Sequence, residues 1–353
     1  MFRKVLIFIF ILTGNLYAEF KLTNLINDLQ SPWSITIVKK NTYLINEKSG
    51  NIKIFDRSKN TVKKIKHNLK VLEHGQGGLL DIYYHKGKVY VSYSEERDDN
   101  MKSSTSVAVA NFNEDKMSFQ NIFQSQPPIR SGYHFGSRIV IKGDNLFVSS
   151  GERGGKQIGQ EADKHPGSII RINLDGSIPK DNPKFKGKSE WLPEIYQIGI
   201  RNVQGMCLSP FNNEVYMTNH GAKGGDWFGK VNHGGNYGWD KLYWGGTKYS
   251  GLKGGPKWLP GYDKPIKYYV PSIAISACQI YKGEEFQEWN GSALIAALKD
   301  QSLRKVLFKK NNFKSEDIIF KDKIGRLRDI KIGSKGKILI LTDQGGLWEL
   351  SKN

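Results

Sequence analysis

Cysteine is scarce in this sequence. The 353 residues include two cysteines, Cys207 and Cys278, and neither belongs to a Cys-x-x-Cys pair that would indicate a zinc site or thiol redox chemistry. Export of the chain would permit a disulfide between them. Both residues lie in apolar, strand-like runs, "QGMCL" and "ISACQIY", so the sequence favours two buried thiols.

The motifs of several common enzyme classes are also absent. The chain has no P-loop, no His-Glu-x-x-His and no Gly-x-Ser-x-Gly. The stretch "GQGGLL" at 75–80 does not open a helix and therefore does not indicate a nicotinamide fold. Glu152 and Asp163 could suggest the carboxylate pair of a glycosidase, but nothing in the sequence fixes their separation.

No apolar run is long enough to span a membrane. The first residues, "MFRKVLIFIFILTGNLYA", place Arg3 and Lys4 before an apolar run and Ala18 where a signal peptidase could cut. The run is shorter than the roughly 20 residues of a membrane helix, and no cysteine stands at the cut to carry a lipid. We expect a signal peptide at 1–18, a single domain at 19–353, and a periplasmic or secreted protein without stable membrane insertion.

Acidic residues are too few to balance the basic ones. The formal net charge is +19, and loss of Arg3 and Lys4 with the signal peptide leaves +17. Such an excess is typical of nucleic-acid binding. The lysines are nevertheless spread over turns, and no short basic run is interleaved with aromatic residues. The sequence therefore favours a solvated lysine-rich surface and no nucleic-acid partner, while steering of an anionic protein partner stays open.

Helical periodicity is rare, and short β-branched and aromatic runs separated by Gly, Asn, Asp and Lys predict strands and hairpins. The first strand of each repeat has a similar sequence. These strands are "SPWSITIV", "GGLLDIYYH", "FGSRIVI", "QGMCLSP", "SIAISACQIY" and "RLRDIKIG". Repeats of roughly 45 to 70 residues predict an all-β fold, a six-bladed β-propeller with four-stranded antiparallel blades. The segment at 20–26 is expected to complete the last blade and close the ring.

Polar and charged residues gather where strand ends would surround the central channel. They are Gln76, His134, Glu152, Gln157, Arg201, Asn202, Lys299, Asp300, Arg326 and Arg328. The four cationic side chains among them would repel one another unless they bind an anion. The implied ligand carries carboxylates or phosphates. Insertions at 154–166 and 221–262 are expected as loops on the same face.

Several motifs occur together and in a specific order. They are "HGQGGLLD" (74–81), "HFGSR" (134–138), "GSIIRINLDGSIPKDNP" (167–183), "GIRNVQGM" (199–206), "HGAKGGD" (220–226), "GGNYGW" (234–239), "ALKD" (297–300) and "RLRD" (326–329). From about Ser31 to the C-terminus the chain resembles the soluble quinoprotein sugar dehydrogenases, and the aldose sugar dehydrogenases in particular. The resemblance implies a six-bladed propeller that uses pyrroloquinoline quinone (PQQ) and Ca²⁺ to oxidise an aldose sugar to a lactone. It also implies an external electron acceptor, such as a cytochrome.

The same resemblance implies roles for individual residues. His134 would be the general base, and Arg201 would stabilise negative charge on the reduced quinone. The quinone would be bound by Gln76, Gln157, Arg201, Asn202, Lys299, Arg326 and Arg328, and calcium by the backbone carbonyls of Gly221 and Ala222. Tyr133 replaces a smaller polar residue, and "WFGKVN" after Asp226 also departs from the family pattern. These departures concern the substrate rather than the residues assigned to chemistry.

Two other functions remain open from the sequence. A calcium-dependent lactonase-type hydrolase can have the same architecture, but it needs carboxylate ligands at a channel that here is cationic. A non-catalytic binding propeller would have no use for His134 together with the cationic set.

Overall fold

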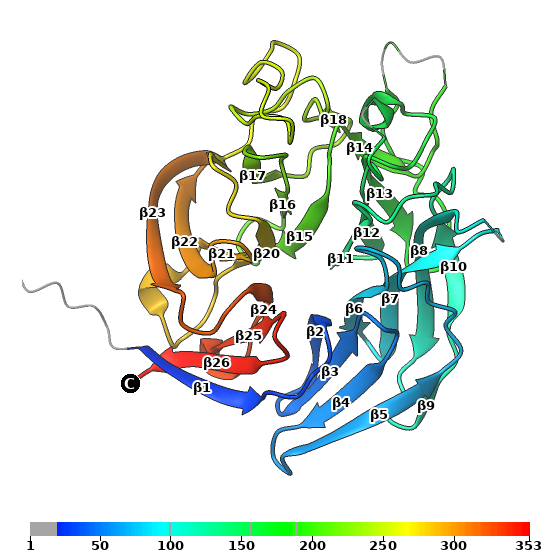
Figure 1. The fold of residues 1–353 in the computed structure, drawn as a ribbon. Helices are drawn as coiled ribbons and strands as arrows, with labels where there is room; N and C mark the ends of the chain where they lie inside the picture. Colours follow the sequence, from blue (N-terminus) through cyan, green and yellow to red (C-terminus); the bar gives the residue numbers. More distant parts are fainter. Residues whose placement is uncertain (1–19, 99, 156, 186, 188–189) are drawn as a thin grey trace, which may run out of the picture.

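The computed structural model describes residues 20–98, 100–155, 157–185, 187 and 190–353 (Figure 1). The predicted signal peptide at 1–18 lies outside these residues. The described strands form six sheets around a central axis, which confirms the six-bladed propeller. Helical structure in this part of the chain is limited to three short 3-10 turns, at Ile158–Gln160, Gln287–Trp289 and Ser334–Gly336. No helix among the described residues is long and apolar enough to cross a membrane.

The first three blades follow one another along the chain, each starting with its innermost strand. Blade 1 contains β2 (Pro32–Lys39), β3 (Thr42–Glu47), β4 (Ile52–Asp56) and β5 (Thr61–His67). Blade 2 contains β6 (Leu79–His85), β7 (Lys88–Glu96), β8 (Ser103–Asn111) and β10 (Gln120–Gln124). Blade 3 contains β11 (Gly136–Lys142), β12 (Asn145–Ser150), β13 (Ser168–Asn173) and β14 (Ile195–Ile198).

The second half of the ring repeats this pattern. Blade 4 contains β15 (Val203–Leu208), β16 (Val215–Asn219), β17 (Asp226–Lys230) and β19 (Lys267–Tyr269). Blade 5 contains β20 (Ile275–Ile280), β21 (Ala293–Ala297), β22 (Ser302–Lys309) and β23 (Asn312–Lys321). Blade 6 contains β24 (Leu327–Ile332), β25 (Ile338–Thr342), β26 (Leu347–Lys352) and, from the other end of the chain, β1 (Phe20–Ile26).

The prediction of four antiparallel strands in each blade is confirmed, and two blades carry a short fifth strand. β9 (Lys116–Met117) pairs in parallel with β5 of blade 1, and β18 (Gly235–Asn236) pairs in parallel with β14 of blade 3. Each additional strand covers hydrogen-bonding groups of an outer strand that would otherwise be an exposed edge.

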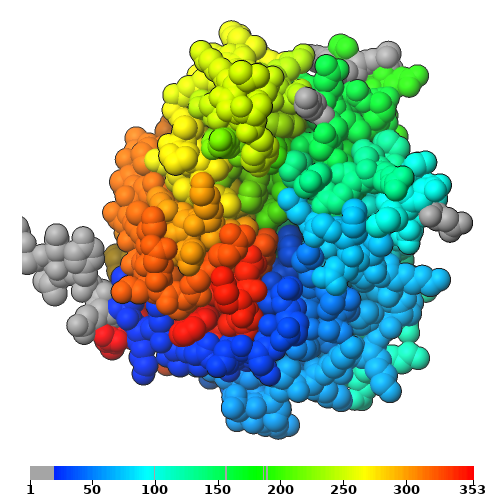
Figure 2. All heavy atoms as spheres, in the orientation of Figure 1, coloured from blue at the N-terminus to red at the C-terminus, as the bar shows by residue number. Residues whose placement is uncertain are grey.

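The predicted ring closure is also confirmed. β1 runs antiparallel to β26, with Phe20 opposite Lys352 and Leu22 opposite Leu350. In the space-filling view the blue N-terminal segment lies against the red C-terminal segment (Figure 2). The last blade therefore obtains its fourth strand from the start of the described chain.

The hydrophobic core consists of layers between neighbouring blades. One layer joins Leu44 and Ile54 of blade 1 to Ile82 and Val91 of blade 2, and equivalent layers follow around the ring. The second strand of a blade is covered on both faces, so its sequence can be a nearly continuous apolar run, as in β21 (ALIAA) and β25 (ILILT), in which every residue is buried. Cys207 and Cys278 lie in the layer between blades 4 and 5, and both are buried and free, as the sequence predicts.

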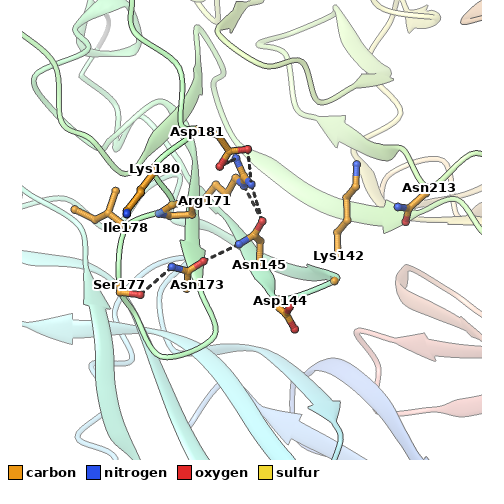
Figure 3. A pocket seen from close by; sticks show the side chains of 12 residues that line it. Lys142, Asp144, Asn145, Arg171, Asn173, Ser177, Ile178, Lys180, Asp181 and Asn213 are labelled. Atoms are coloured by element: carbon orange, nitrogen blue, oxygen red, sulfur yellow. Dashed lines mark hydrogen bonds and ion pairs between the residues drawn. The ribbon is translucent and has the colours of Figure 1, made fainter.

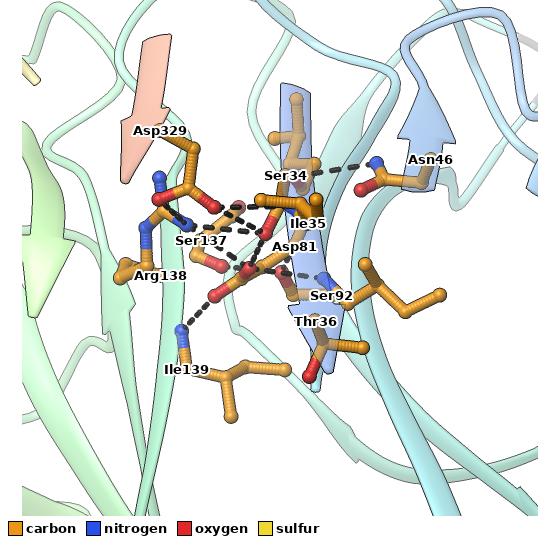
Figure 4. A network of polar contacts seen from close by, with 12 residues as sticks. Ser34, Ile35, Thr36, Asn46, Asp81, Ser92, Ser137, Arg138, Ile139 and Asp329 are labelled. Atoms are coloured by element: carbon orange, nitrogen blue, oxygen red, sulfur yellow. Dashed lines mark hydrogen bonds and ion pairs between the residues drawn. The ribbon is translucent and has the colours of Figure 1, made fainter. Parts of the chain in front are cut away.

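A buried ionic network ties inner strands together near the axis (Figure 4). Arg138 of β11 lies 3.1 Å from Asp81 of β6 and 3.2 Å from Asp329 of β24, and each of the three side chains is at most 2% exposed. Ser34 of β2 donates a hydrogen bond to Asp81. The Arg138 guanidinium also stacks on Trp33, 4.4 Å from the ring centre. Four blades are thereby joined through one arginine.

Candidate functional site

Two adjoining cavities contain most of the predicted site residues. The cationic cavity has a volume of about 280 Å³ and is lined by Trp33, Lys48, Gly75, Gln76, His134, Arg201, Asn202, Gln204, His220, Tyr249, Ala274, Leu298, Arg326 and Arg328. The aromatic cavity has a volume of about 580 Å³ and is lined by Gln76, Tyr133, His134, Glu152, Gly154, Arg201, Ala222, Trp239, Tyr243, Lys248, Tyr249 and Ser250. Gln76, His134, Arg201 and Tyr249 line both, so the cavities meet at these side chains.

The cationic cavity has an excess of positive charge. Lys48, Arg201, Arg326 and Arg328 line it, and none of its described lining residues is acidic. Arg326 and Arg328 each donate a hydrogen bond to Asp343, at 3.0 and 2.7 Å. Burial raises the pKa of Asp343, but the two arginines outweigh it and hold that pKa below its usual value. One carboxylate therefore faces two guanidinium groups, which leaves a net positive charge. Because of this charge the cavity can accept an anion.

His220 adds a buried polar group to this cavity. Its Nε2 atom is buried and has no hydrogen-bond partner in the described part of the chain. Burial is the main reason that the pKa of His220 falls to about 4, and the charges of Arg201 and Arg328 act in the same direction. The imidazole is therefore neutral at neutral pH. A buried ring nitrogen without a partner in a cavity rich in guanidinium groups is suited to contact with a polar ligand.

His134 is held in one orientation by two other side chains. Its backbone N–H donates to Gln76 Oε1 at 2.9 Å, and its Nδ1 lies 2.6 Å from Glu152 Oε1. Glu152 is 3% exposed, and its carboxylate fixes the proton on Nδ1, which leaves the Nε2 lone pair free. Burial lowers the pKa of His134, the Glu152 contact opposes this, and the charge of Arg201 lowers the pKa further.

The pairing of β11 with β12 brings His134 and Glu152 together. His134 precedes β11, Glu152 follows β12, and Gly136 lies opposite Ser150. A side chain at Gly151 would collide with the carbonyl oxygen of His134, so the close approach requires glycine there. The sequence placed Glu152 in the channel ring but gave it no role with His134, because the spacing of the two residues alone does not show that they touch.

Arg201 and Asn202 come from the segment before β15. The Arg201 side chain is 5% exposed, with Nε 3.9 Å from Glu152 Oε1 and the guanidinium carbon 5.3 Å from the Trp239 ring centre. Asn202 Oδ1 accepts a hydrogen bond from the Gly136 N–H at 3.0 Å. Arg201 therefore places a desolvated positive charge beside His134, and Asn202 fixes the start of β11.

Two predicted cofactor ligands lie outside both cavities. Gln157 and Lys299 are exposed, and neither is among the lining residues of the cationic or the aromatic cavity. Their roles stay predictions. Lys48, for which the sequence predicted no role, lines the cationic cavity and donates from Nζ to the Gly75 carbonyl at 2.8 Å. Its position directly after β3, at the end of a second strand, is the signal that could have identified it.

The predicted calcium segment forms a tight loop next to the aromatic cavity. The Gly221 N–H donates to Asp226 Oδ1 at 2.8 Å, and a side chain at Gly221 would collide with the backbone of Gly224 and Gly225. Ala222 lines the aromatic cavity, and its carbonyl lies 3.4 Å from Ser272 Oγ. The described residues contain no cluster of three or more His, Cys, Asp or Glu side chains that could hold a metal. Backbone carbonyls in a glycine-rich loop are suitable calcium ligands without such a cluster.

A larger cavity of about 730 Å³ contains none of the predicted residues (Figure 3). It lies beside blade 3 and is lined by residues including Lys142, Asn145, Arg171 and Asp181. Arg171 already donates to Asn145 Oδ1 at 2.7 Å and to Asp181 Oδ2 at 3.1 Å. The guanidinium is therefore satisfied within the protein, so volume alone does not make this cavity the candidate site.

Curated relatives of this chain include sugar dehydrogenases. The aldose sugar dehydrogenase YliI of Escherichia coli (strain K12) is 32% identical over 329 residues, which are 90% of this chain and 88% of that protein. The quinoprotein glucose dehydrogenase B of Acinetobacter calcoaceticus is 26% identical, over 64% of this chain and 52% of that protein.

Solved structures show the same architecture. The apo-form of the soluble aldose sugar dehydrogenase from Escherichia coli matches with a TM-score of 0.89 and 31% identity, covering 95% of this chain and 100% of that one. The PQQ-bound aldose sugar dehydrogenase from Streptomyces coelicolor has a TM-score of 0.78 at 19% identity and covers 95% and 99%, which shows a shared fold. The family model for glucose / sorbosone dehydrogenases matches residues 29–349, and this chain belongs to that family.

Proposed function

We propose that this protein is an exported oxidoreductase that uses PQQ and calcium to oxidise the anomeric hydroxyl of aldose sugars to lactones. One observation carries the proposal: His134, oriented by Glu152, lies where a cationic cavity meets an aromatic one. The similarity to the Escherichia coli aldose sugar dehydrogenase supports the reaction class. An external acceptor, such as a cytochrome, would receive the electrons.

The cationic cavity fits a ligand with several carboxylates. Arg201, Arg326 and Arg328 would pair with the carboxylates of PQQ, because guanidinium groups form two parallel hydrogen bonds to such anions. Lys48 would add a point charge, and the carbonyls of Gly221 and Ala222 would hold the calcium ion. When bound, PQQ supplies an acceptor for hydride from the anomeric carbon.

The remaining chemistry belongs to side chains of the protein. With its Nδ1 proton donated to Glu152, His134 would accept the proton of the anomeric hydroxyl at Nε2. The Glu152 carboxylate would stabilise the resulting imidazolium. Arg201, 5% exposed, would supply a fixed positive charge where negative charge develops, and burial would make that charge more effective than it is in water.

The two alternative functions receive less support. A calcium-dependent hydrolase needs acidic ligands, and no cluster of three or more potential metal-ligating side chains occurs in the described ranges. A pure binding module has no need for a buried His–Glu pair with a free Nε2 lone pair. The family membership supports neither alternative specifically.

Reconstitution tests the proposed function. Apoprotein supplied with PQQ, calcium and glucose should reduce an artificial dye, and omission of PQQ or chelation of calcium should abolish the activity. No dye reduction by any aldose with a fully loaded protein would reject the enzyme hypothesis.

Arg328→Met should weaken PQQ binding. Loss of a charge-assisted hydrogen bond is expected to raise Kd about 10- to 100-fold, measured by isothermal titration of the apoprotein. Arg304→Met is the matched control, because Arg304 pairs with Asp300 and Glu316 and lines neither cavity. Equal Kd values for the wild type and the Arg328 variant would place the quinone elsewhere.

The pH profile should report the ionisation of His134. A general base must be neutral, and burial lowers the pKa of His134 below 6.5, so kcat/KM should fall only as the pH drops through a value below 6.5. Since Glu152 raises this pKa, Glu152→Gln should move the acidic limb to still lower pH while reducing the plateau rate. An acidic limb above pH 6.5, or one unmoved in the variant, would contradict the assignment.

A further inference from the structure

Arg153 is a buried cationic residue that the proposed reaction does not use. It is 3% exposed, and it lines neither the cationic nor the aromatic cavity. Burial lowers the pKa of Arg153 to about 9, and the charge of Glu152 opposes this, so the guanidinium still carries its charge at neutral pH. Taking such a group out of water is unfavourable unless its donors are paired. The hydrogen bonds of Arg153 therefore indicate its role.

The guanidinium of Arg153 donates to two other segments of the chain. Its Nε donates to the Tyr133 carbonyl at 2.8 Å, and its Nη2 donates to the Ser131 carbonyl. Nη1 donates to the Ser103 carbonyl at 2.7 Å, and Nη2 also contacts the Ser103 hydroxyl at 3.2 Å. Ser103 begins β8 of blade 2. One side chain from the loop after β12 of blade 3 thereby ties the chain beside His134 to blade 2.

These contacts fix the peptide bond that precedes the imidazole. The Tyr133 carbonyl, which Arg153 holds, is one end of the peptide bond to His134. The N–H at the other end donates to Gln76 Oε1 at 2.9 Å. His134 has a φ of 49°, a left-handed conformation that residues other than glycine rarely adopt and that persists only where surrounding contacts hold it. Since the position of this peptide determines where the side chain points, fixing it directs the imidazole toward Glu152.

The contacts of Arg153 suit a planar fork. A guanidinium presents several N–H donors in one plane, so it can bind carbonyls of separate segments while its face packs on a ring. The Cζ atom of Arg153 lies 3.5 Å from the centre of the Phe135 ring. A lysine would keep the charge on a single flexible ammonium group, and a methionine would keep only an apolar stem. These two replacements separate the charge of Arg153 from its hydrogen bonds.

We propose that Arg153 is a positioning residue, which holds the backbone at His134 so that the imidazole meets Glu152 and presents Nε2 where the two cavities join. This inference rests on the proposed function, in which His134 is the base, and adds a residue to it. Arg153 acts through the backbone of His134, because it lines neither cavity. Glu152 and Arg153 are consecutive, so one short segment after β12 fixes both the ring and the backbone of His134.

Kinetics of two variants test the proposal. Arg153→Met should lower kcat about 10- to 100-fold, because a small displacement of a catalytic group is enough to slow the reaction. Arg153→Lys should lower kcat to a comparable extent, and it serves alone if the methionine variant does not fold. The Kd for PQQ, measured by isothermal titration, should change less than about twofold, since the guanidinium groups of the cationic cavity are untouched. Wild-type kcat in Arg153→Lys would show that only the charge matters, and wild-type kcat in either variant would overturn the inference.

Arg171→Met is the matched control. Arg171 also belongs to blade 3, lies 5.6 Å from the centre of the Tyr196 ring, and lines neither cavity. Its replacement removes a partly buried guanidinium of the same blade and should leave kcat unchanged. A loss of kcat equal to that of the Arg153 variants would show a general effect of destabilising blade 3, which would also overturn the inference.

An NMR signal tests the positioning without turnover. In apoprotein with isotope-labelled histidine, the Nδ1 proton of His134, bonded to Glu152, should give a downfield signal that exchanges slowly with water. Its loss in His134→Ala identifies it. The signal should broaden or disappear in both Arg153 variants and remain in Arg171→Met. A signal unchanged in the Arg153 variants would overturn the inference and leave the proposed function standing. Loss of the signal in them, with no turnover of any sugar by the wild type, would reject the oxidoreductase and keep Arg153 as the residue that positions His134.

Discussion

His134→Ala is expected to lower kcat by about 10²- to 10⁴-fold, the usual contribution of a positioned general base. The variant loses the one imidazole that lines both cavities and is oriented by a buried carboxylate. Its affinity for PQQ should remain close to that of the wild type, because the guanidinium groups assigned to the carboxylates are untouched. Dye reduction with saturating PQQ and sugar measures the first effect, and isothermal titration measures the second.

His233→Ala is the control for this experiment. His233 is exposed and its Nε2 contacts the Asp181 carbonyl, remote from the two cavities' lining residues. Its replacement should leave turnover unchanged. If His134→Ala retained at least a tenth of the wild-type kcat, the proton acceptor would have to be another group.

Arg138→Met is expected to destabilise the fold by about 3–5 kcal/mol, because it leaves two buried carboxylates without their shared cation. Asp81 and Asp329 are at most 2% exposed, so water cannot replace the arginine. Burial already raises the pKa of Asp81, in spite of the attraction of Arg138. Urea unfolding, followed by tryptophan fluorescence, measures the change in the free energy of unfolding.

Lys63→Met provides the comparison. Lys63 pairs with Asp115, and the two side chains are 57% and 81% exposed, so the loss of this ion pair should cost far less. Similar losses for the two variants would show that the axial network contributes no more than a surface pair.

The propeller could be predicted from the sequence because its signal is repeated. Six repeats with similar first strands predicted the number of blades, and the additional segment at 20–26 predicted the closing strand. The structure has six blades, and β1 pairs with β26 as expected. Arg326 and Arg328 are two residues apart, a spacing that places side chains of an extended segment on the same side, and both contact Asp343 and line the cationic cavity. Local spacing was sufficient for these features.

Other parts of the site depend on contacts between distant segments. Glu152 orients His134 because β11 pairs with β12, and because Gly151 has no side chain where its backbone approaches the His134 carbonyl. Lys48 and Tyr249 reach the cavities from a turn in blade 1 and a long loop near blade 4, and a single sequence gives no distance between them. His220 belongs to the motif at 220–226, but the burial of its Nε2 atom, and the lack of a partner for it among the described residues, follow from packing alone.

The seam between β1 and β26 constrains how the chain can acquire its structure. Phe20 has its partner at Lys352, so β1 stays unpaired until the chain has been synthesised as far as β26. Contacts between such distant residues form slowly, since the intervening chain must first be brought together. A chain whose N-terminal strand pairs last stays incompletely folded while it is being synthesised. This order of folding is compatible with the proposed export of an unfolded chain.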